Sequence, residues 1–296
     1  MPKTVLGVVG GSGVYDLPGL SNKQWVDVQS PFGKPSDEIL FAEFEGLPVR
    51  FLPRHGRGHR LSPDGIDYRA NIDALKRAGV TDLVSISAVG SLREELEPGR
   101  FVLVDQYVDR TNGRARSFFG NGLVAHVPLA EPAAAHLLDV AQAAADALEI
   151  AYRRGGTLVV IEGPQFSTRA ESELYRQWGA DVIGMTAMPE ARLAREAEIA
   201  YATIAMVTDY DCWHPGHDAV DVGAVVQVLN ANRGKAQALV AEIARRMSRE
   251  MVDCPARRAL DFAIMTAQDK RDAQAIARLD AVAGRVLRPG QNGPQG

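Results

Sequence analysis

The chain has 296 residues, of which 33 are Lys or Arg and 37 are Asp or Glu, so its formal net charge is −4. Apolar residues make up 46 % and charged residues 24 %. These values are typical of a soluble globular protein and exclude a disordered, collagen-like or coiled-coil chain. The mild negative charge argues against a nucleic-acid-binding protein, which usually carries a basic face.

Neither a membrane span nor a secretion signal is visible in the sequence. No apolar run approaches the roughly 18 residues that cross a bilayer, and the N-terminal residues lack the layout of a signal peptide. Two cysteines, Cys212 and Cys254, are too few for a disulfide framework. We therefore expect a reduced, cytoplasmic protein with neither a nucleic acid nor a membrane as its partner.

Short apolar runs alternate with helical patterns along the chain. Strands are predicted at residues 5–9, 39–44, 49–52, 83–87, 101–107, 157–161, 181–185 and 201–207. Helices are predicted at residues 68–79, 132–148, 168–179, from 189 onward and at 225–247, and the remainder is expected to be helical to about residue 287. This alternation predicts a three-layer α/β/α fold with a central mixed sheet flanked by helices. We expect one domain over residues 1–287 and a disordered tail at 288–296.

Two segments have a more specific signature. Thr168 precedes Glu171 by three residues, which is the spacing of a capping box, and Ala170, Leu174 and Trp178 follow on one face of the same helix. Residues 109–125 form a long irregular stretch. Structureless loops of this length are uncommon and are often active-site lids, so a lid and a mobile surface loop remain as alternatives.

A glycine-rich turn, Gly10 to Gly13 with Ser12 inside it, directly follows the first predicted strand. Successive backbone N–H groups in such a turn form a nest for phosphate, although a plain tight turn has the same composition. A dinucleotide fingerprint requires glycine where the chain has Asp16, which argues against an NAD-binding module.

A second cluster, Arg54 to Arg60, follows another predicted strand. The guanidinium of Arg54 offers a fork for phosphate and the imidazole of His55 a further hydrogen bond, whereas a solvated charged loop is the alternative. Binding of a metal by His55 and His59 would need a helix, which the two intervening glycines disfavour.

Two further strand ends carry candidate ligand-binding residues. Residues 87–92 place Ser87 and small neighbours where the ligand crevice of an α/β sheet usually lies, although simple packing would use the same residues. In residues 162–169, Phe166 is either a ring that stacks on a flat ligand or an ordinary core residue.

Asp209 and Asp211 end a very apolar strand and share one side of an extended chain. A partly protonated carboxyl could donate to a ring nitrogen, and its neighbour could accept from an amino group; a turn with Asx hydrogen bonds is the alternative. Cys212, His214 and His217 supply only three ligands at irregular spacing, so we expect no metal.

Together these motifs resemble the methylthioadenosine phosphorylase family, in the trimeric purine nucleoside phosphorylase class. The resemblance spans about residues 6–229 and consists of nine motifs in register: GGSGVYD, PFGKPS, PRHGRGH, YRANI, ISAVGSLREE, DQYVDRT, IEGPQFSTRAES, WGADVIGMT and TDYDCWH. It implies phosphorolysis of S-methyl-5′-thioadenosine to adenine and 5-methylthioribose 1-phosphate, in purine and methionine salvage. It also implies a homotrimer that needs no cofactor, with a small nucleoside and phosphate as its partners.

The resemblance also assigns roles by position. The positions that match phosphate-binding ones are Ser12, Arg54, His55, Ser87, Ala88 and Thr186. Those that match nucleoside-binding ones are Met185, Phe166, Ile183, Asp209, Tyr210, Asp211 and, lent across a subunit interface, His126. Ser167 and Val222 match positions linked to substrate preference, and Asp209 and Asp211 are the expected catalytic pair.

The chain departs from the family pattern at a few positions, and related activities remain as alternatives. Gly184 stands where some relatives have Asn, and Ser12 and Ser87 stand where others have Thr. Retention of both Asp209 and Asp211 favours a 6-aminopurine, because a 6-oxopurine presents an acceptor to a carboxylate. A phosphorylase for methylthioinosine, adenosine or inosine is the main alternative, followed by a hydrolytic nucleosidase, a non-catalytic nucleotide-binding module and a structural protein.

Overall fold

The computed structural model describes residues 3–11, 17–216 and 222–288. Its strands are β1 (Leu6–Gly10), β2 (Leu20–Val26), β3 (Ile39–Phe44), β4 (Leu47–Pro53), β5 (Asp82–Ser91), β6 (Phe101–Val104), β7 (Gln106–Asp109), β8 (Tyr152–Arg154), β9 (Thr157–Val160), β10 (Val182–Gly184) and β11 (Ala200–Asp209). Its α-helices are α1 (Tyr68–Arg77), α2 (Ala135–Ala147), α3 (Arg169–Gln177), α4 (Ala187–Glu196), α5 (Val222–Arg246), α6 (Ala273–Arg278) and α7 (Asp280–Leu287). Two short 3-10 helices lie at Pro255–Arg258 and Gln268–Lys270.

In the described part of the chain, eleven strands join in one mixed sheet whose central strand is β5. β5 pairs in parallel with β1 and β11 and antiparallel with β10. The hairpin predicted at residues 39–52 is present as antiparallel β3 and β4. β1, β5 and β11 are almost continuously buried, as expected for apolar strands covered on both faces.

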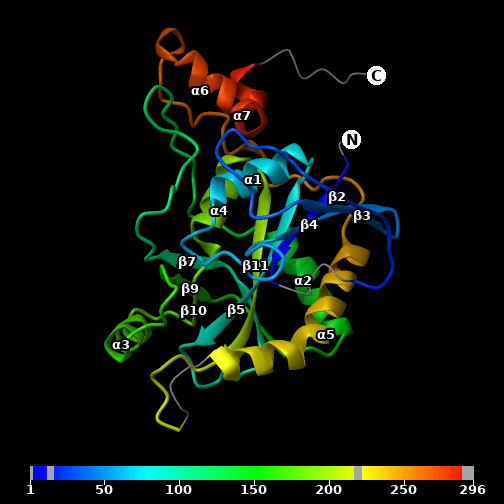
Figure 1. Cartoon of the computed structure of the whole chain (residues 1–296), viewed down its shortest axis with the longest axis vertical. Coiled ribbons are helices and arrows are strands. Elements are labelled where there is room, and N and C mark those ends of the chain that lie inside the picture. Colours follow the sequence, from blue (N-terminus) through cyan, green and yellow to red (C-terminus); the bar gives the residue numbers. More distant parts are fainter. Residues whose placement is uncertain (1–2, 12–16, 217–221, 289–296) are drawn as a thin grey trace.

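Helices cover both faces of this sheet, so the predicted three-layer α/β/α fold is confirmed (Figure 1). One buried cluster joins the sheet to α1, α4 and the C-terminal helices, with Ile72 and Leu193 among its members. A second cluster joins the other face to α2 and α5, with Leu137 and Leu239 among its members. No helix among the described residues is long and apolar enough to cross a membrane.

Two predictions from local sequence patterns need correction. The strand predicted at residues 101–107 is two strands that meet at Asp105: β6 pairs with β11 and β8, whereas β7 pairs with β9. The segment after α5 is largely irregular between residues 247 and 272 rather than helical. The predicted capping box of Thr168 and Glu171 is confirmed. On the face predicted for this helix, Leu174 and Trp178 are exposed, whereas Tyr175 of α3 is buried.

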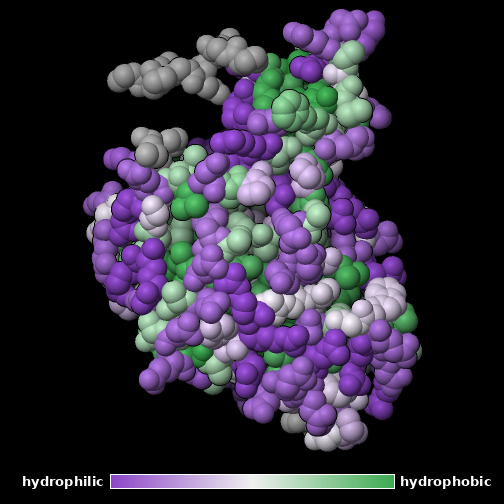
Figure 2. Space-filling model, turned by 180° about the vertical axis from the view of Figure 1, so that it is seen from behind, coloured by the Kyte–Doolittle hydropathy of each residue, from purple (hydrophilic) through white to green (hydrophobic). Residues whose placement is uncertain are grey.

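The C-terminal segment, residues 255–288, projects from the rest of the molecule (Figure 1). Its surface includes Phe262, which is 98 % exposed, and Met265. Figure 2 shows hydrophobic surface gathered at this end of an otherwise mostly hydrophilic face. The expected tail at 288–296 lies outside the described residues apart from Arg288.

Candidate active site

A cavity of about 600 Å³ opens where β1, β4, β5, β10 and β11 end. This volume is in the usual range for small-molecule sites, and such crevices commonly hold the ligand in α/β sheets. Its lining includes the following residues proposed from the sequence: Arg54, His55, Ser87, Ala88, Phe166, Ser167, Ile183, Met185, Thr186, Asp209 and Asp211.

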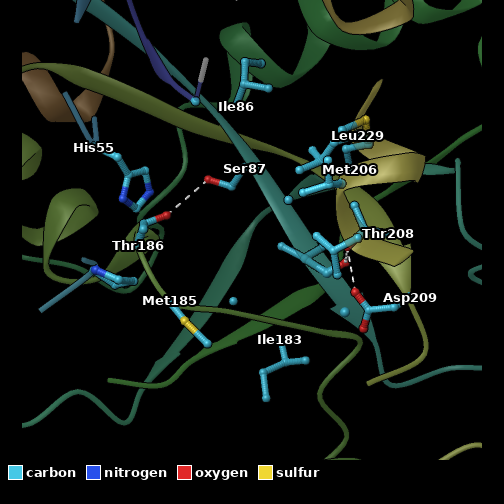
Figure 3. A pocket seen from close by; sticks show the side chains of 18 of the residues that line it. His55, Ile86, Ser87, Ile183, Met185, Thr186, Met206, Thr208, Asp209 and Leu229 are labelled. Atoms are coloured by element: carbon cyan, nitrogen blue, oxygen red, sulfur yellow. Dashed lines mark hydrogen bonds between the residues drawn. The ribbon is translucent and has the colours of Figure 1, made fainter. Parts of the chain in front are cut away.

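The cavity has two polar regions of different chemistry, which Figure 3 shows apart from each other. His55, Ser87 and Thr186 lie together in one region, with 3.4 Å between the Ser87 and Thr186 hydroxyl oxygens. Gly11 and Ala88 also line the cavity beside these hydroxyls. This region has hydroxyl and N–H donors that suit an oxyanion.

His55 presents its ring to this region in one defined tautomer. Its Nδ1 lies 2.9 Å from the carbonyl oxygen of Leu61, so Nδ1 carries the proton and a neutral ring has its lone pair on Nε2. Burial lowers the pKa of His55 to about 4, and the charge of Arg54 acts in the same direction. His55 is therefore neutral at pH 7 and can accept a hydrogen bond from a protonated phosphate oxygen.

Arg54 is placed differently from what the sequence suggested. Its fork does not face the cavity, because Nε and Nη2 donate to the two carboxylate oxygens of Glu190 at 2.9 and 3.1 Å. Burial alone would lower the pKa of Arg54, yet the charge and hydrogen bonds of Glu190 raise it above its ordinary value. Sequence reasoning missed Glu190, which lies 136 positions from Arg54 and carries no local motif.

The second polar region contains Asp209 and Asp211. The register of β11 against β5 shifts between Val207 and Asp209, so two residues of β11 face one of β5 and the chain bulges. Asp209 accepts hydrogen bonds from the Thr208 hydroxyl at 2.7 Å and from the backbone N–H of Asp211 at 2.8 Å. The bulge and these two bonds fix the carboxylate at the rim of the cavity.

Burial raises the pKa values of both carboxyls, and the charge of Asp209 raises that of Asp211 further. A residue with a side chain at position 90 would collide with this pair, since a Cβ on Gly90 would lie 2.8 Å from Oδ1 of Asp209. The pair can thus offer a proton from one carboxyl and an acceptor from the other.

Apolar side chains form the rest of the cavity wall. Figure 3 shows Ile183 and Met185 on one side of the cavity and Met206 and Leu229 on another. The amphipathic pattern of α5 predicted its buried face, but not that Val226, Asn230 and Arg233 line the cavity. Only the docking of α5 on the sheet brings them there, so no signal in the sequence would have found them.

Some proposed residues are not brought to this cavity. Tyr210 does not line the cavity, and its hydroxyl donates to the Glu94 carbonyl at 3.0 Å instead. His126 does not line the cavity, and its backbone N–H donates to the carbonyl of Ala263 in the projecting C-terminal segment. Ser12 and the side chain of Val222 lie outside the described residues.

The irregular segment 109–125 contributes no residue to the cavity lining, so the lid hypothesis has no support in the described structure. The segment is anchored instead, with Phe118 and Phe119 buried. The guanidinium of Arg114 donates to the carbonyls of Met185 and Met188 at 2.7 and 2.8 Å, and its Nε donates to Glu162 at 3.0 Å. Arg114 therefore holds in place two segments next to the cavity, the one at Glu162 and the one from Met185 to Met188.

The described residues contain no group of three His, Cys, Asp or Glu that could hold a metal ion. His217, one of the three possible zinc ligands in the sequence, lies outside the described part of the chain.

Residues 5–245 match the family model of the phosphorylase superfamily, which is more than half of the chain. The chain belongs to the phosphorylase superfamily.

Within this superfamily, the chain is similar to proteins that share one name. It is 59 % identical to an S-methyl-5′-thioadenosine phosphorylase of Bradyrhizobium diazoefficiens over 97 % of this chain and 100 % of that protein. It is also 59 % identical to the protein of the same name from Rhodospirillum rubrum, over 96 % and 97 % of the two chains.

Solved superfamily structures show the same fold. A methylthioadenosine phosphorylase from an Antarctic soil metagenomic library superimposes with a TM-score of 0.90 at 47 % identity, covering 95 % of this chain and 99 % of that one. A methylthioadenosine phosphorylase of Schistosoma mansoni in complex with adenine gives a TM-score of 0.78 at 36 % identity, over 82 % and 91 %.

Proposed function

We propose that this chain catalyses the phosphorolysis of S-methyl-5′-thioadenosine by inorganic phosphate, giving adenine and 5-methylthioribose 1-phosphate. The observation that carries this proposal is that one cavity holds both an oxyanion-binding region and, at a separate place, the carboxylate pair of Asp209 and Asp211. The names of the similar proteins and the adenine complex of one of them support the choice of substrate.

Phosphate binds at the first polar region in this proposal. The hydroxyls of Ser87 and Thr186 and the backbone at Ala88 donate to it, together with Arg54 and Ser12. Nε2 of the neutral His55 ring accepts a hydrogen bond from a protonated phosphate oxygen. One phosphate oxygen attacks C1′ of the ribose while the bond from C1′ to N9 breaks and its electron pair passes to adenine. The transition state has oxocarbenium character, so the negative phosphate stabilises the developing positive charge.

Asp209 is the proposed acid that protonates N7 of the leaving adenine. Its burial raises its pKa, which favours the protonated carboxyl that this role needs. Asp211 either accepts from the 6-amino group or holds Asp209 in place, and its backbone N–H already donates to the Asp209 carboxylate. Phe166 and Ile183 line the base site and Met185 contacts the ribose.

The 5′ substituent lies against the apolar wall of Met206, Val225 and Leu229 in this proposal. Such a wall favours a methylthio group over a hydroxyl, because a buried hydroxyl without a partner is costly. Ser167 and Val222 set substrate preference in this proposal, whereas Tyr210 lies off the cavity.

We also propose a homotrimer without a cofactor, in the cytoplasm, in which His126 completes the 5′ site of a neighbouring subunit. The position of His126 supports this, since it lies beside the exposed apolar residue Phe262 rather than at its own cavity. A single domain over residues 1–287 remains part of the proposal.

The decisive experiment measures the release of free base from methylthioadenosine, methylthioinosine, adenosine and inosine, each with and without phosphate. We expect phosphate-dependent release that is fastest with methylthioadenosine. Release without phosphate would indicate a hydrolytic nucleosidase, and a preference for the inosine forms would contradict the roles of Asp209 and Asp211. Equal rates with adenosine would favour a broader nucleoside phosphorylase, such as the relative from Schistosoma mansoni named adenosine/methylthioadenosine phosphorylase.

A further inference from the structure

Glu190 forms a buried ion pair with Arg54 directly behind the proposed phosphate site. Arg54 is 2 % exposed and Glu190 is 1 % exposed. The two hydrogen bonds between them join both carboxylate oxygens to two nitrogens of the guanidinium. Such a bidentate pair fixes the plane of the guanidinium as well as its position.

A line of three hydroxyl groups holds the carboxylate of Glu190 from the other side. The Tyr107 hydroxyl donates to Thr203 at 2.9 Å, the Thr203 hydroxyl donates to Tyr201 at 3.0 Å, and the Tyr201 hydroxyl donates to Glu190 at 2.9 Å. Every donor in this line points toward the carboxylate. The line of hydroxyls therefore adds a third hydrogen bond to the Glu190 carboxylate, beside the two from Arg54.

The same contacts leave Arg54 little capacity to bind a ligand. A guanidinium has five N–H donors. Nε donates to Glu190, and one N–H of Nη1 donates to the Ile86 carbonyl. The two N–H groups of Nη2 are shared among Glu190, Ser85 and, at 3.5 Å, the Val9 carbonyl. Within the described residues, these contacts account for four of the five, so a single N–H on Nη1 is left for the cavity that Arg54 lines.

We propose that Glu190 is a positioning residue for the phosphate site, acting through Arg54 in two ways. It directs one N–H of Arg54 into the cavity, and it cancels the guanidinium charge, so that phosphate is held by neutral donors and retains its own negative charge. This inference rests on the proposed function.

The charge balance has a direct kinetic consequence. Arg54, Glu190 and His55 together contribute no formal charge, because Arg54 is paired with Glu190 and His55 is neutral at pH 7. A phosphate whose charge is not neutralised by the protein can stabilise the positive charge that develops on the ribose. An unpaired Arg54 would bind phosphate more tightly but would weaken that stabilisation.

The test is a comparison of Glu190→Gln with the wild-type chain, using inorganic phosphate as the varied substrate and as the titrant in calorimetry. The amide oxygen of this variant still accepts one hydrogen bond from Arg54 and so keeps the guanidinium oriented, but it no longer cancels the guanidinium charge. We therefore expect the KM and Kd for phosphate to fall about threefold to tenfold, while kcat falls about tenfold or more, the size of a lost transition-state interaction. A merely structural role would lower the amount of active protein or raise KM. The control Glu95→Gln, at an exposed position, should match the wild type.

A second variant keeps the test valid if Glu190→Gln does not fold. Arg54→Met with Glu190→Leu removes both charges, and such replacements of a buried pair are usually tolerated. We expect its phosphate KM to rise about tenfold, the effect of losing one hydrogen bond to a charged group. The single variant Arg54→Met should raise KM by about a further tenfold, because Glu190 would then repel phosphate.

Two results would overturn the inference: a raised phosphate KM in Glu190→Gln, or equal phosphate KM values in Arg54→Met and the double variant. Failure of the proposed function has a different signature. In that case, the wild-type chain itself would show neither phosphate binding nor phosphate-dependent release of adenine.

Discussion

Asp209 shows how a single residue depends on its immediate surroundings for its proposed chemistry. The bulge in β11 and the two hydrogen bonds that the Asp209 carboxylate accepts fix the direction of this side chain. The lack of a side chain at Gly90 leaves room for the carboxylate. The sequence predicted the Asp209–Asp211 pair from its spacing. It could not predict the bulge, which depends on the register against β5.

The first prediction at this scale concerns the proposed acid. Asp209→Asn should lower kcat for adenine release by about 100-fold or more, the usual contribution of a general acid, because an amide cannot donate an acidic proton to N7. Steady-state kinetics with methylthioadenosine and saturating phosphate measure the effect. Asp139→Asn, on the exposed face of α2, is the matched control and should stay within about twofold of the wild type. A similar kcat for Asp209→Asn and the control would contradict the assignment.

The second prediction uses the pKa of His55, which burial lowers from 6.5 to about 4. Between pH 6.5 and 4 the unfolded chain binds a proton at this histidine that the folded chain does not. The free energy of unfolding is therefore at its full value above pH 6.5 and decreases as the pH falls toward 4. The full loss is about 3 kcal/mol. Urea unfolding in phosphate-free buffer should show this loss in the wild type and not in His55→Gln. Parallel pH profiles for the two proteins would contradict it.

Among the larger elements, the segment 109–125 differs most from expectation. Its composition and length indicated a lid or a mobile loop, but it is fixed by two buried phenylalanines and by Arg114. The backbone carbonyls that Arg114 contacts belong to residues on either side of Thr186. An irregular segment can therefore be rigid when its polar groups have partners in distant elements.

We predict that Arg114→Met lowers kcat/KM for both substrates by about tenfold or more, since the segment from Met185 to Met188 loses two charge-assisted hydrogen bonds and small displacements of binding groups are costly. Arg116→Met, in the same segment but with a side chain 47 % exposed, is the control and should be nearly neutral. Kinetics together with thermal melting distinguish misplacement from unfolding. An unchanged kcat/KM in a folded Arg114→Met protein would show that the hydrogen bonds from Arg114 are not needed to position this segment.

For the whole molecule, the projecting C-terminal segment is the feature that one subunit alone does not explain. A phenylalanine that is 98 % exposed is unusual on the surface of a monomer, and this one lies in the segment that contacts His126. Both observations fit the proposed homotrimer, in which this segment would pack against a neighbour.

The corresponding prediction is that Phe262→Glu shifts the protein from three times 31.9 kDa toward 31.9 kDa in light scattering. A charge placed in an apolar interface costs several kcal/mol unless it is paired. The KM for methylthioadenosine should rise in the same variant, because His126 would no longer reach a neighbouring site. Leu148→Glu, at the end of α2, is the control. A trimer that persists in Phe262→Glu would place the interface elsewhere.

The sequence by itself determined the elements whose signals are local: the buried strands, the capping box at Thr168, the end of α1 at Gly79 and the polar clusters at strand ends. Periodicity and caps depend on residues within a few positions of one another, so they are visible without a structure. The tertiary structure decided the rest. It paired Arg54 with Glu190, divided residues 101–109 between two branches of the sheet and left α3 exposed, because these outcomes depend on strand order and on contacts between residues far apart in the chain.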